Sequence, residues 1–176
     1  MIKHLIIVLF VSTLFVSLNV EAQKSFEKGD VLLSPGIGWG TRVGASNFFW
    51  PNVIFNADFG VHDYVSVGPY AAVAFGGNRY NAYSIGACAS FHWWQLLDDK
   101  VAKDLKQDQI DFYLPFWLGA RILTNHNGSS RSNGFDAGLG LGLRWYPNAN
   151  QRFALYGEWG RGPISWGSVG MTIKVN

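Results

Sequence analysis

Apolar residues alternate strictly with small or charged ones in the segment from Phe135 to Tyr146. The odd-numbered positions carry Phe135, Ala137, Leu139, Leu141, Leu143 and Trp145, and the even-numbered positions carry Asp136, Gly138, Gly140, Gly142, Arg144 and Tyr146. Because successive residues of a β-strand point to opposite faces, one face of this strand is wholly apolar and the other is small and charged. A water-facing surface favours Lys, Glu or Thr over a row of glycines. The segment therefore predicts a strand of a membrane β-barrel, with apolar side chains toward lipid and small or charged ones toward a narrow interior.

Seven further segments show the same alternation. The eight predicted strands are Asp30 to Arg42, Asn52 to His62, Tyr64 to Gly76, Asn81 to Trp94, Ile110 to Leu123, Phe135 to Tyr146, Arg152 to Gly160 and Ile164 to Val175. Each is long enough for the roughly 9–11 residues that a tilted strand needs to cross a bilayer. None has a charge on its apolar face, where a charge at the midplane would cost about 2–4 kcal/mol. We therefore predict an all-β fold, an eight-stranded antiparallel up-and-down transmembrane β-barrel, with local bulges at the in-strand residues Pro35 and Pro69.

The connections between these strands fall into two groups, one at each end of the predicted barrel. On the side of the chain termini, which we expect to face the periplasm, lie His62-Asp63, Gln95 to Gln109, and Pro147 to Gln151. The outer loops are Val43 to Pro51, Gly77 to Tyr80, Thr124 to Gly134, and Arg161 to Pro163. The segment Gln95 to Gln109 is long for a periplasmic connection. Its charges and the spacing of Val101 and Leu105 predict a short helix or a solvated excursion.

The N-terminus has the layout of a secretory signal. Lys3 precedes an apolar run from Leu5 to Leu18, and Val20-Glu21-Ala22 places small residues where a signal peptidase reads them. The apolar run is shorter than the roughly 20 residues that a transmembrane helix needs to span a bilayer, which disfavours an uncleaved membrane anchor. We predict cleavage after Ala22, so that residues 1–22 are a signal peptide and residues 23–176 form the barrel domain. The predicted location is the bacterial outer membrane, reached by secretion through the inner membrane.

The composition agrees with this class of protein. Hydrophobic residues make up 48% of the chain and charged residues 15%, which suits lipid-facing walls around a tight interior. The single cysteine, Cys88, has no partner for an intrachain disulfide. Lysines and arginines are scattered along the chain rather than clustered, so we expect no nucleic-acid partner.

Several charged residues fall on the inward face of the predicted strands. An eight-stranded barrel is just wide enough to be filled by its own side chains, so buried charges there have to pair. We predict a salt-bridged interior plug, and the alternative is a narrow gated conductance or proton path. Glu158 is expected near Gly140, within reach of Arg121 or Arg144. The predicted interior polar cluster is Asp58, Asp111, Arg121, Asp136, Arg144, Glu158 and Lys174.

The last three predicted strands contain the stretches GLGLGLRWYP, RFALYGEWG and SVGMTIKV, which together with the eight-strand pattern resemble a known family. The chain resembles the small eight-stranded outer-membrane barrels of the OmpA-barrel and OmpX type, in the form common in Bacteroidetes-like bacteria. The resemblance implies insertion by the outer-membrane insertion machinery, contact with lipopolysaccharide and phospholipid, and a monomer. One departure is that the chain ends Lys174-Val175-Asn176, where family members usually end on an aromatic residue.

Catalytic signatures are weak in this sequence. Lipid A deacylases carry a His-x-Ser pair on one strand, whereas this chain has Ser90-Phe91-His92 in reversed order and near the periplasmic rim. Lipid A palmitoyltransferases use polar residues around outer loops, for which the candidates here are His126, Ser129, Ser130 and Asp136. Glycine recurs every second residue inside strands and not at a strand-to-helix turn, so no nucleotide cofactor is implied.

The remaining histidines are not arranged for metal binding. His62, His92 and His126 include no pair at metal-ligand spacing. We therefore predict no catalytic, cofactor-binding or metal-binding residues. The predicted function is a structural, envelope-integrity barrel with a plugged, porin-like architecture, and the alternative is a lipid A-modifying enzyme of the deacylase or acyltransferase type.

Overall fold

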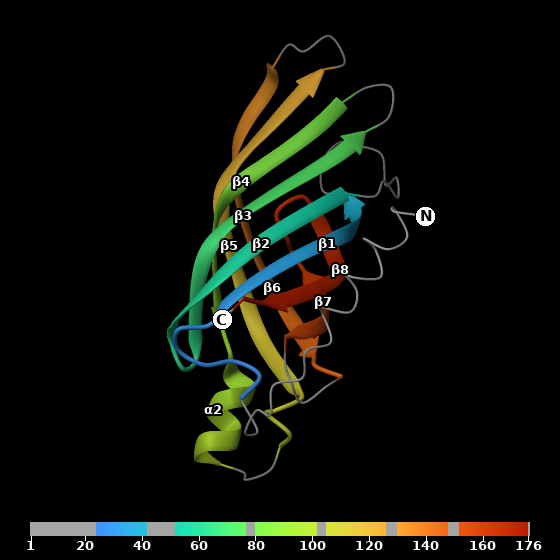
Figure 1. Ribbon diagram of the computed structural model, residues 1–176. Coiled ribbons are helices and arrows are strands. Elements are labelled where there is room, and N and C mark those ends of the chain that lie inside the picture. The colour runs from blue at the N-terminus through green and yellow to red at the C-terminus, as the bar shows by residue number, and fades with distance from the viewer. Residues whose placement is uncertain are drawn as a thin grey trace, which may run out of the picture.

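The computed structural model describes residues 24–41, 52–76, 80–101, 105–125, 130–147 and 152–175. Eight antiparallel strands form a closed barrel in which each strand pairs with the next along the chain and the last pairs with the first (Figure 1). The strands are β1 (Val31–Thr41), β2 (Asn52–His62), β3 (Val65–Gly76), β4 (Tyr80–Phe91), β5 (Ile110–Asn125), β6 (Ser130–Trp145), β7 (Phe153–Gly160) and β8 (Ser165–Lys174). The predicted eight-stranded up-and-down barrel is therefore confirmed. The predicted signal peptide, residues 1–22, lies outside the described residues.

The strand register gives the tilt of the barrel. From Ile122 on β5, paired residues lead through Tyr83, Val73, Val53, Ile37, Val169, Gly157 and Leu143 back to β5 at Phe112. Following the paired residues once around the barrel therefore leads back to β5 at a position ten residues (122 − 112) earlier in the sequence. With eight strands about 4.8 Å apart and about 3.3 Å per residue, this offset tilts the strands by about 40° from the barrel axis, within the range of membrane barrels.

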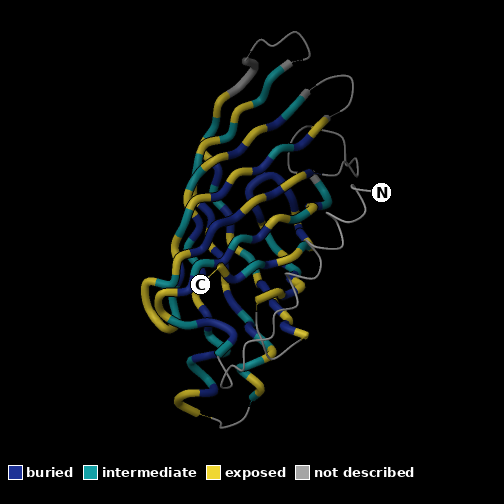
Figure 2. Tube along the Cα trace, in the orientation of Figure 1, coloured by how far each residue is buried: buried dark blue, intermediate teal, exposed yellow. Residues whose placement is uncertain are grey.

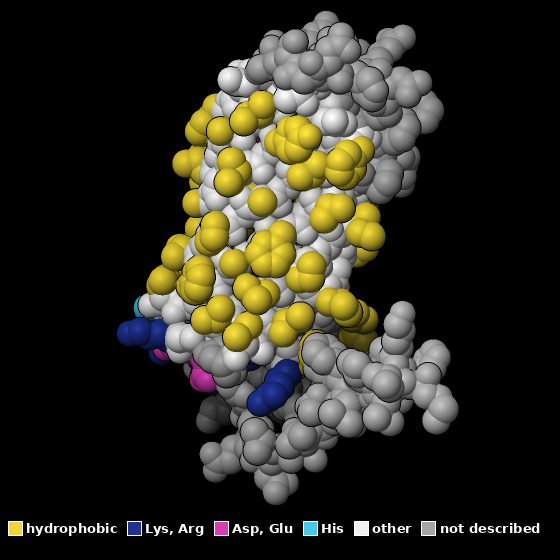
Figure 3. Space-filling view, turned by 45° about the horizontal axis from the view of Figure 1, so that its top comes forward, with side chains coloured by type: hydrophobic (Ala, Val, Ile, Leu, Met, Phe, Trp, Pro, Cys, Tyr) yellow, Lys and Arg dark blue, Asp and Glu magenta, His cyan; other side chains and the backbone are white. Residues whose placement is uncertain are grey.

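The two faces of the barrel wall differ as the alternation predicts. Exposed and buried residues alternate along most of the strands (Figure 2). On the face shown in Figure 3, apolar side chains cover the wall, and Lys, Arg, Asp and Glu side chains appear only toward one end. Among the outward residues of β6, Phe135 and Leu139 are 70% and 61% exposed, whereas the inward residues Asp136 and Arg144 are 1% exposed. Such a wall suits a hydrocarbon surrounding, because the closed strand order leaves no unpaired sheet edge and the apolar side chains face out.

The ends of several strands differ from the prediction. β4 stops at Phe91 and not at Trp94, because Trp93 and Trp94 begin the helix α2 (Trp93–Lys100). Of the two alternatives predicted for the long connection, the short helix is the one found. It starts two residues earlier than that connection and ends before Val101 and Leu105, whose spacing had suggested it. Both indole rings pack on Phe112 of β5, at ring-centroid distances of 5.6 and 4.9 Å. Aromatic packing at the rim thus explains why the apolar alternation ends before Trp93.

β5 and β6 continue beyond the segments in which their outward residues are apolar. β6 begins at Ser130, five residues before the predicted start at Phe135, and β5 runs to Asn125. The hairpin pairing continues into polar sequence, which the apolar alternation could not reveal.

The two in-strand prolines interrupt the hydrogen-bonded ladder without shifting its register. On either side of Pro35, β1 pairs with β8 at Leu33–Ile173 and Gly36–Gly170, which is one continuous register. β2 and β3 likewise keep one register across the position of Pro69. The bulges expected at these prolines are therefore wrong. The register shifts lie near strand ends, at Gly60–His62 and at Leu123–Thr124.

No helix in the described part of the chain is long and apolar enough to cross a membrane.

Candidate functional site

Arg144 is the centre of the polar interior. Its Nη2 donates a 2.6 Å hydrogen bond to Asp58, and its Nη1 lies 3.5 Å from Asp111. The guanidinium also lies over the Tyr113 ring, 4.1 Å from the centroid. β6, which carries Arg144, is four strands away from β2, which carries Asp58, in either direction around the barrel. The Arg144–Asp58 ion pair therefore joins opposite walls and crosses the lumen.

Glu158 does not join this ion pair. The register places it opposite Gly142 and not near Gly140, so the predicted pairing was two residues out of register. Its carboxylate accepts 2.9 Å hydrogen bonds from the hydroxyls of Tyr113 and Ser168. The expected ion pair with Arg121 or Arg144 is wrong, because two neutral hydroxyls already solvate the carboxylate and Arg144 is directed at Asp58 and Asp111.

The other members of the predicted cluster are spread along the barrel axis. Asp136 accepts a 3.3 Å hydrogen bond from Ser84, whose hydroxyl also lies 3.0 Å from that of Tyr70. Lys174 pairs with Asp30 at 2.8 Å, at the end of the barrel that carries the start of β1. Arg121 is only partly buried and lies near Gly134. The structure thus brings together Asp58, Asp111 and Arg144, with Glu158 nearby through Tyr113, and leaves Asp136, Arg121 and Lys174 apart from them.

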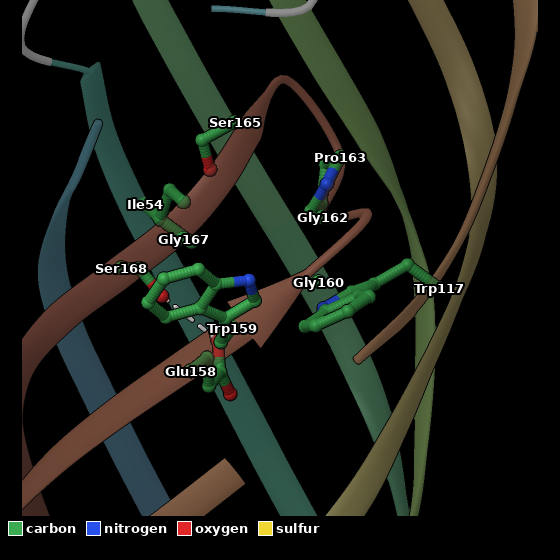
Figure 4. Close-up of a pocket in the computed structure, with 10 residues that line it drawn as sticks. All are labelled: Ile54, Trp117, Glu158, Trp159, Gly160, Gly162, Pro163, Ser165, Gly167 and Ser168. Carbon is green, nitrogen blue, oxygen red and sulfur yellow. Dashed lines mark hydrogen bonds between the residues drawn. The ribbon is translucent and has the colours of Figure 1, made fainter. Parts of the chain in front are cut away.

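Glycines make room for the largest interior side chains. A Cβ at Gly142 would overlap the Tyr113 ring, and one at Gly36 would overlap the Tyr156 hydroxyl. The inward glycines that the alternation predicted therefore let aromatic rings from other strands fill the lumen. A hollow between Trp117 and the β7–β8 connection, lined at its lower side by Glu158 and Ser168, has room for about one water molecule (Figure 4).

Beyond Trp117 the interior holds apolar and polar side chains together. Ile54, Ala72, Ala74, Ala82 and Ile164 form one buried cluster, against which Leu123 packs. The buried polar residues Asn52, Ser84 and Asp136 also lie in this part. The ion-paired charges, Asp58, Asp111, Arg144, Asp30 and Lys174, lie toward the end of the barrel at which β1 begins, which we call the terminal mouth. The inward residues of the sequence alternation did not predict that the ion pairs gather at this end.

Residues 24–30 close the terminal mouth and are called the N-terminal strap. Phe26 is fully buried and stacks on His92, with 3.6 Å between ring centroids and 7° between planes. The backbone N–H of Ser25 donates to Gln107, and its hydroxyl accepts a short hydrogen bond from Gln95 of α2. The strap was missed in the sequence because it has no alternation. The apolar Phe26 among polar neighbours was its only signal.

An ion pair fastens the start of the strap to helix α2. Lys24 Nζ lies 2.8 Å from Asp99, which also accepts a hydrogen bond from the Tyr64 hydroxyl. The hydrogen bond and charge of Asp99 raise the pKa of Lys24. Burial acts to raise the pKa of Asp99, but the hydrogen bond and charge of Lys24 outweigh it and lower that pKa below its usual value. Both shifts favour the ionised pair.

The residues weighed for an enzymatic role are not assembled as the known enzymes would require. The Ser90 hydroxyl lies near the Cys88 sulfur, while His92 contacts Ser66 and Asp111. Asp136 is inside the barrel, bonded to Ser84. His126 and Ser129 lie outside the described residues, and Ser130 is the first residue of β6. Within the described ranges, no group of three or more His, Cys, Asp or Glu side chains could hold a metal ion.

Comparisons with known proteins identify the fold. No protein-family model matches the chain, and no curated protein matches its sequence. The N-terminal β-barrel domain of Pseudomonas aeruginosa OprF is 16% identical, with 84% of this chain and 98% of that domain covered and a TM-score of 0.52. A de novo designed transmembrane β-barrel is 15% identical, with 85% and 99% covered and a TM-score of 0.51. Ail, the attachment invasion locus protein of Yersinia pestis, is 13% identical, with 84% and 95% covered and a TM-score of 0.46. With the closed strand order, the first two likenesses show a small β-barrel of the outer-membrane type.

Proposed function

We propose that the protein is an integral outer-membrane barrel with a structural, envelope-integrity role, and that its lumen is closed by its own side chains. The observation that carries this proposal is the buried Arg144–Asp58 ion pair, which spans the lumen between opposite walls. The lumen around this ion pair is filled by Tyr113, Tyr156 and the Phe26 ring of the strap. A barrel built in this way presents an apolar wall to lipid and offers no open path for solutes.

The partners in this proposal are lipids and the machinery that inserts the barrel. The exposed apolar wall fits lipopolysaccharide and phospholipid chains, and aromatic residues such as Trp145 and Phe153 at strand ends fit the headgroup level. Residues 1–22 act as the signal peptide, and the mature barrel, residues 23–176, is a monomer that faces the periplasm with its terminal mouth. The proposal includes no cofactor and no nucleic acid.

A lumen-spanning ion pair is an effective closure because it is costly to break. Removing one partner of a buried ion pair typically costs about 3–5 kcal/mol, since the other charge is left buried without compensation. Thermal opening of the Arg144–Asp58 pair alone would meet the same cost. The closed state is therefore the resting state, and a narrow gated conductance is limited to rare openings.

Conductance of the reconstituted protein tests this proposal. In planar bilayers, the wild-type barrel is expected to show no steady open-pore current. The double variant Phe26→Ala/Arg144→Ala removes the strap ring and the lumen-spanning cation, and it is expected to conduct small ions steadily. Arg121→Ala, which changes a partly buried cation outside the ion pair, is the matched control and should stay closed. A steady open-pore current through folded wild-type protein would contradict the proposal.

The alternative function, a lipid A-modifying enzyme, is addressed by a separate measurement. The Ser90 and His92 side chains have other partners, so the Ser90-Phe91-His92 stretch does not form the catalytic pair of a lipid A deacylase. A lipid A mass spectrum from a deletion strain decides between the two functions. An unchanged acyl pattern is expected for a structural barrel, and a gained or lost acyl chain would support the enzyme.

A further inference from the structure

Three polar side chains form a hydrogen-bonded line in the terminal mouth. The Ser66 hydroxyl lies 3.1 Å from His92 Nε2, and His92 Nδ1 lies 2.9 Å from an Asp111 carboxylate oxygen. All three are fully buried. Ser66 is on β3, His92 follows the last residue of β4, and Asp111 is on β5, so three neighbouring strands fix the spacing. The proposed structural role uses Asp111 to hold Arg144 and leaves Ser66 and His92 unexplained.

The chemistry of the partners fixes the direction of these hydrogen bonds. An ionised carboxylate only accepts, so His92 Nδ1 carries the hydrogen and donates it to Asp111. In the neutral imidazole, Nε2 is then left as an acceptor for the Ser66 O–H. A serine whose proton is accepted by a histidine, itself oriented by a carboxylate, is the arrangement that activates a serine nucleophile. Arg144 Nη1 lies 3.5 Å from Asp111 and helps to orient its carboxylate.

Phe26 covers this line of residues. Its ring lies flat on the His92 ring, and it belongs to a strap near the N-terminus and not to a barrel strand. The strap is fastened at its start by the Lys24–Asp99 pair, in which the Lys24 side chain is 40% exposed. Along the inner wall of β3 and β4 around Ser66, the side chains are small: Gly68, Cys88 and Ser90. Displacement of Phe26 would therefore uncover His92 next to the small side chains of β3 and β4, while the Tyr113 ring of β5 stays beside His92 at 5.6 Å between ring centroids.

We propose that Ser66 is a nucleophile toward carboxylic esters that enter the terminal mouth, with His92 as its base, Asp111 as the positioning residue for His92, and Phe26 as a displaceable cover. Ser66 Oγ forms a bond to the ester carbonyl carbon while its proton moves to His92 Nε2. The bond from that carbon to the alcohol oxygen breaks, and the alcohol leaves with the proton. Water then attacks the acyl-serine by the same route, which releases the carboxylic acid and restores Ser66. This activity goes beyond the structural role and does not depend on whether the lumen conducts.

A fluorophosphonate probe, which reacts with activated serines, tests the proposal on folded protein in detergent micelles. Wild-type protein is expected to be labelled slowly at Ser66, and Phe26→Ala about tenfold faster or more, because a larger fraction of molecules is uncovered. Ser66→Ala in the Phe26→Ala background should abolish the label. Ser90→Ala in the same background is the matched control and should keep it, since Ser90 is a neighbouring buried serine that contacts Cys88. Hydrolysis of a short p-nitrophenyl carboxylic ester should follow the same order.

Two results would overturn the proposal. One is a label that survives Ser66→Ala, which would place the reactive group elsewhere. The other is the absence of label from wild-type protein after prolonged exposure and from each Phe26 variant that folds, as judged by heat-modifiable gel mobility. If Phe26→Ala does not fold, Phe26→Leu takes its place, because leucine keeps the apolar filling but cannot stack flat on His92.

Discussion

Arg144 is the residue whose replacement should cost the barrel most. Its guanidinium neutralises Asp58 directly, and Asp58 has no other cation within ion-pair distance in the described part of the chain. We expect Arg144→Met to lower the free energy of unfolding by about 3–5 kcal/mol, because Asp58 is left buried and unpaired. The double variant Arg144→Met/Asp58→Asn should lose less than Arg144→Met alone. Urea unfolding followed by tryptophan fluorescence measures both variants and Asp58→Asn. A loss in the double variant equal to the sum of the two single losses would mean that the two side chains are not energetically coupled.

The lipid-facing assignment can also be tested at single residues. Leu141 of β6 is exposed in the middle of the apolar wall. Val175, which follows the last residue of β8, is exposed at the end of the wall. We expect Leu141→Arg to destabilise the barrel in lipid vesicles by about 2–4 kcal/mol and Val175→Arg by about 0–1 kcal/mol, because the cost of a charge falls toward the bilayer surface. Folding equilibria in vesicles give both values. A similar cost at the two positions would show that this face does not lie in hydrocarbon.

The alternation predicted which residues face the interior but not which of them meet. Asp58, Asp111 and Arg144 were each placed inward from period-two counting alone, and their burial follows from it. Their contacts depend on which walls face each other across the lumen, and this is set by the ten-residue offset of the barrel register. Glu158 shows the limit of this counting. The predicted pairing of β6 with β7 was wrong by two residues, and it placed Glu158 opposite Gly140 when the structure has it opposite Gly142.

At the level of elements, the strap and helix α2 should depend on pH through the Lys24–Asp99 pair. The folded pKa of Asp99 is lowered, so its stabilisation is present above the unfolded value of about 3.9 and is lost as the pH falls through the folded value. The folded pKa of Lys24 is raised, so its stabilisation is present below about 10.5 and is lost as the pH rises through the folded value. Between these limits the pair should contribute less than about 1 kcal/mol, because it is partly exposed.

The variant Asp99→Asn isolates this contribution. We expect its melting temperature to lie below that of the wild type between about pH 5 and pH 9. At low pH the two melting temperatures should converge, because the protonated Asp99 of the wild type is then neutral, like the amide of the variant. Asp63→Asn serves as a control, since Asp63 accepts a hydrogen bond from the backbone of Lys28 and no lysine side chain pairs with it in the described residues. A difference between wild type and Asp99→Asn that persists unchanged at low pH would assign the effect to packing.

Elements were predictable from the sequence where a single physical rule applied along them. Within the apolar wall, period-two alternation defines each strand, and seven of the eight strand ends at the terminal mouth fall within one residue of prediction, the end of β4 being the exception. The alternation rule does not apply to segments outside the barrel wall. α2 begins at Trp93 through aromatic packing on Phe112, and the strap is held by Phe26 stacking on His92, which is 66 residues away in sequence (92 − 26). Contacts of this kind leave no periodic signal in either segment.

For the whole molecule, maturation and the placement of the strap are connected. The proposed cleavage after Ala22 would leave Lys24 as the second residue, immediately before the buried Ser25 and Phe26. A short mature N-terminus can enter the mouth without carrying the apolar signal segment toward it. We expect the intact mass of protein purified from the native membrane to begin at Gln23. A mass that begins at Met1 would contradict both the cleavage site and the proposed signal peptide.

Closure of the whole barrel rests on two barriers in series along the lumen, and this predicts how variants combine. The Phe26 ring closes the terminal mouth, and the Arg144–Asp58 pair crosses the lumen next to it, since both contact the His92–Asp111 pair. With barriers in series, either one alone keeps the conductance low. Phe26→Ala and Arg144→Ala should therefore each raise the single-channel conductance only slightly, and their combination should raise it by more than the sum of the two. Glu158→Gln should leave it unchanged, because hydroxyls and not Arg144 hold that carboxylate. If Glu158→Gln opened the barrel as far as the double variant, the closure would lie at the Tyr113–Glu158–Ser168 layer instead.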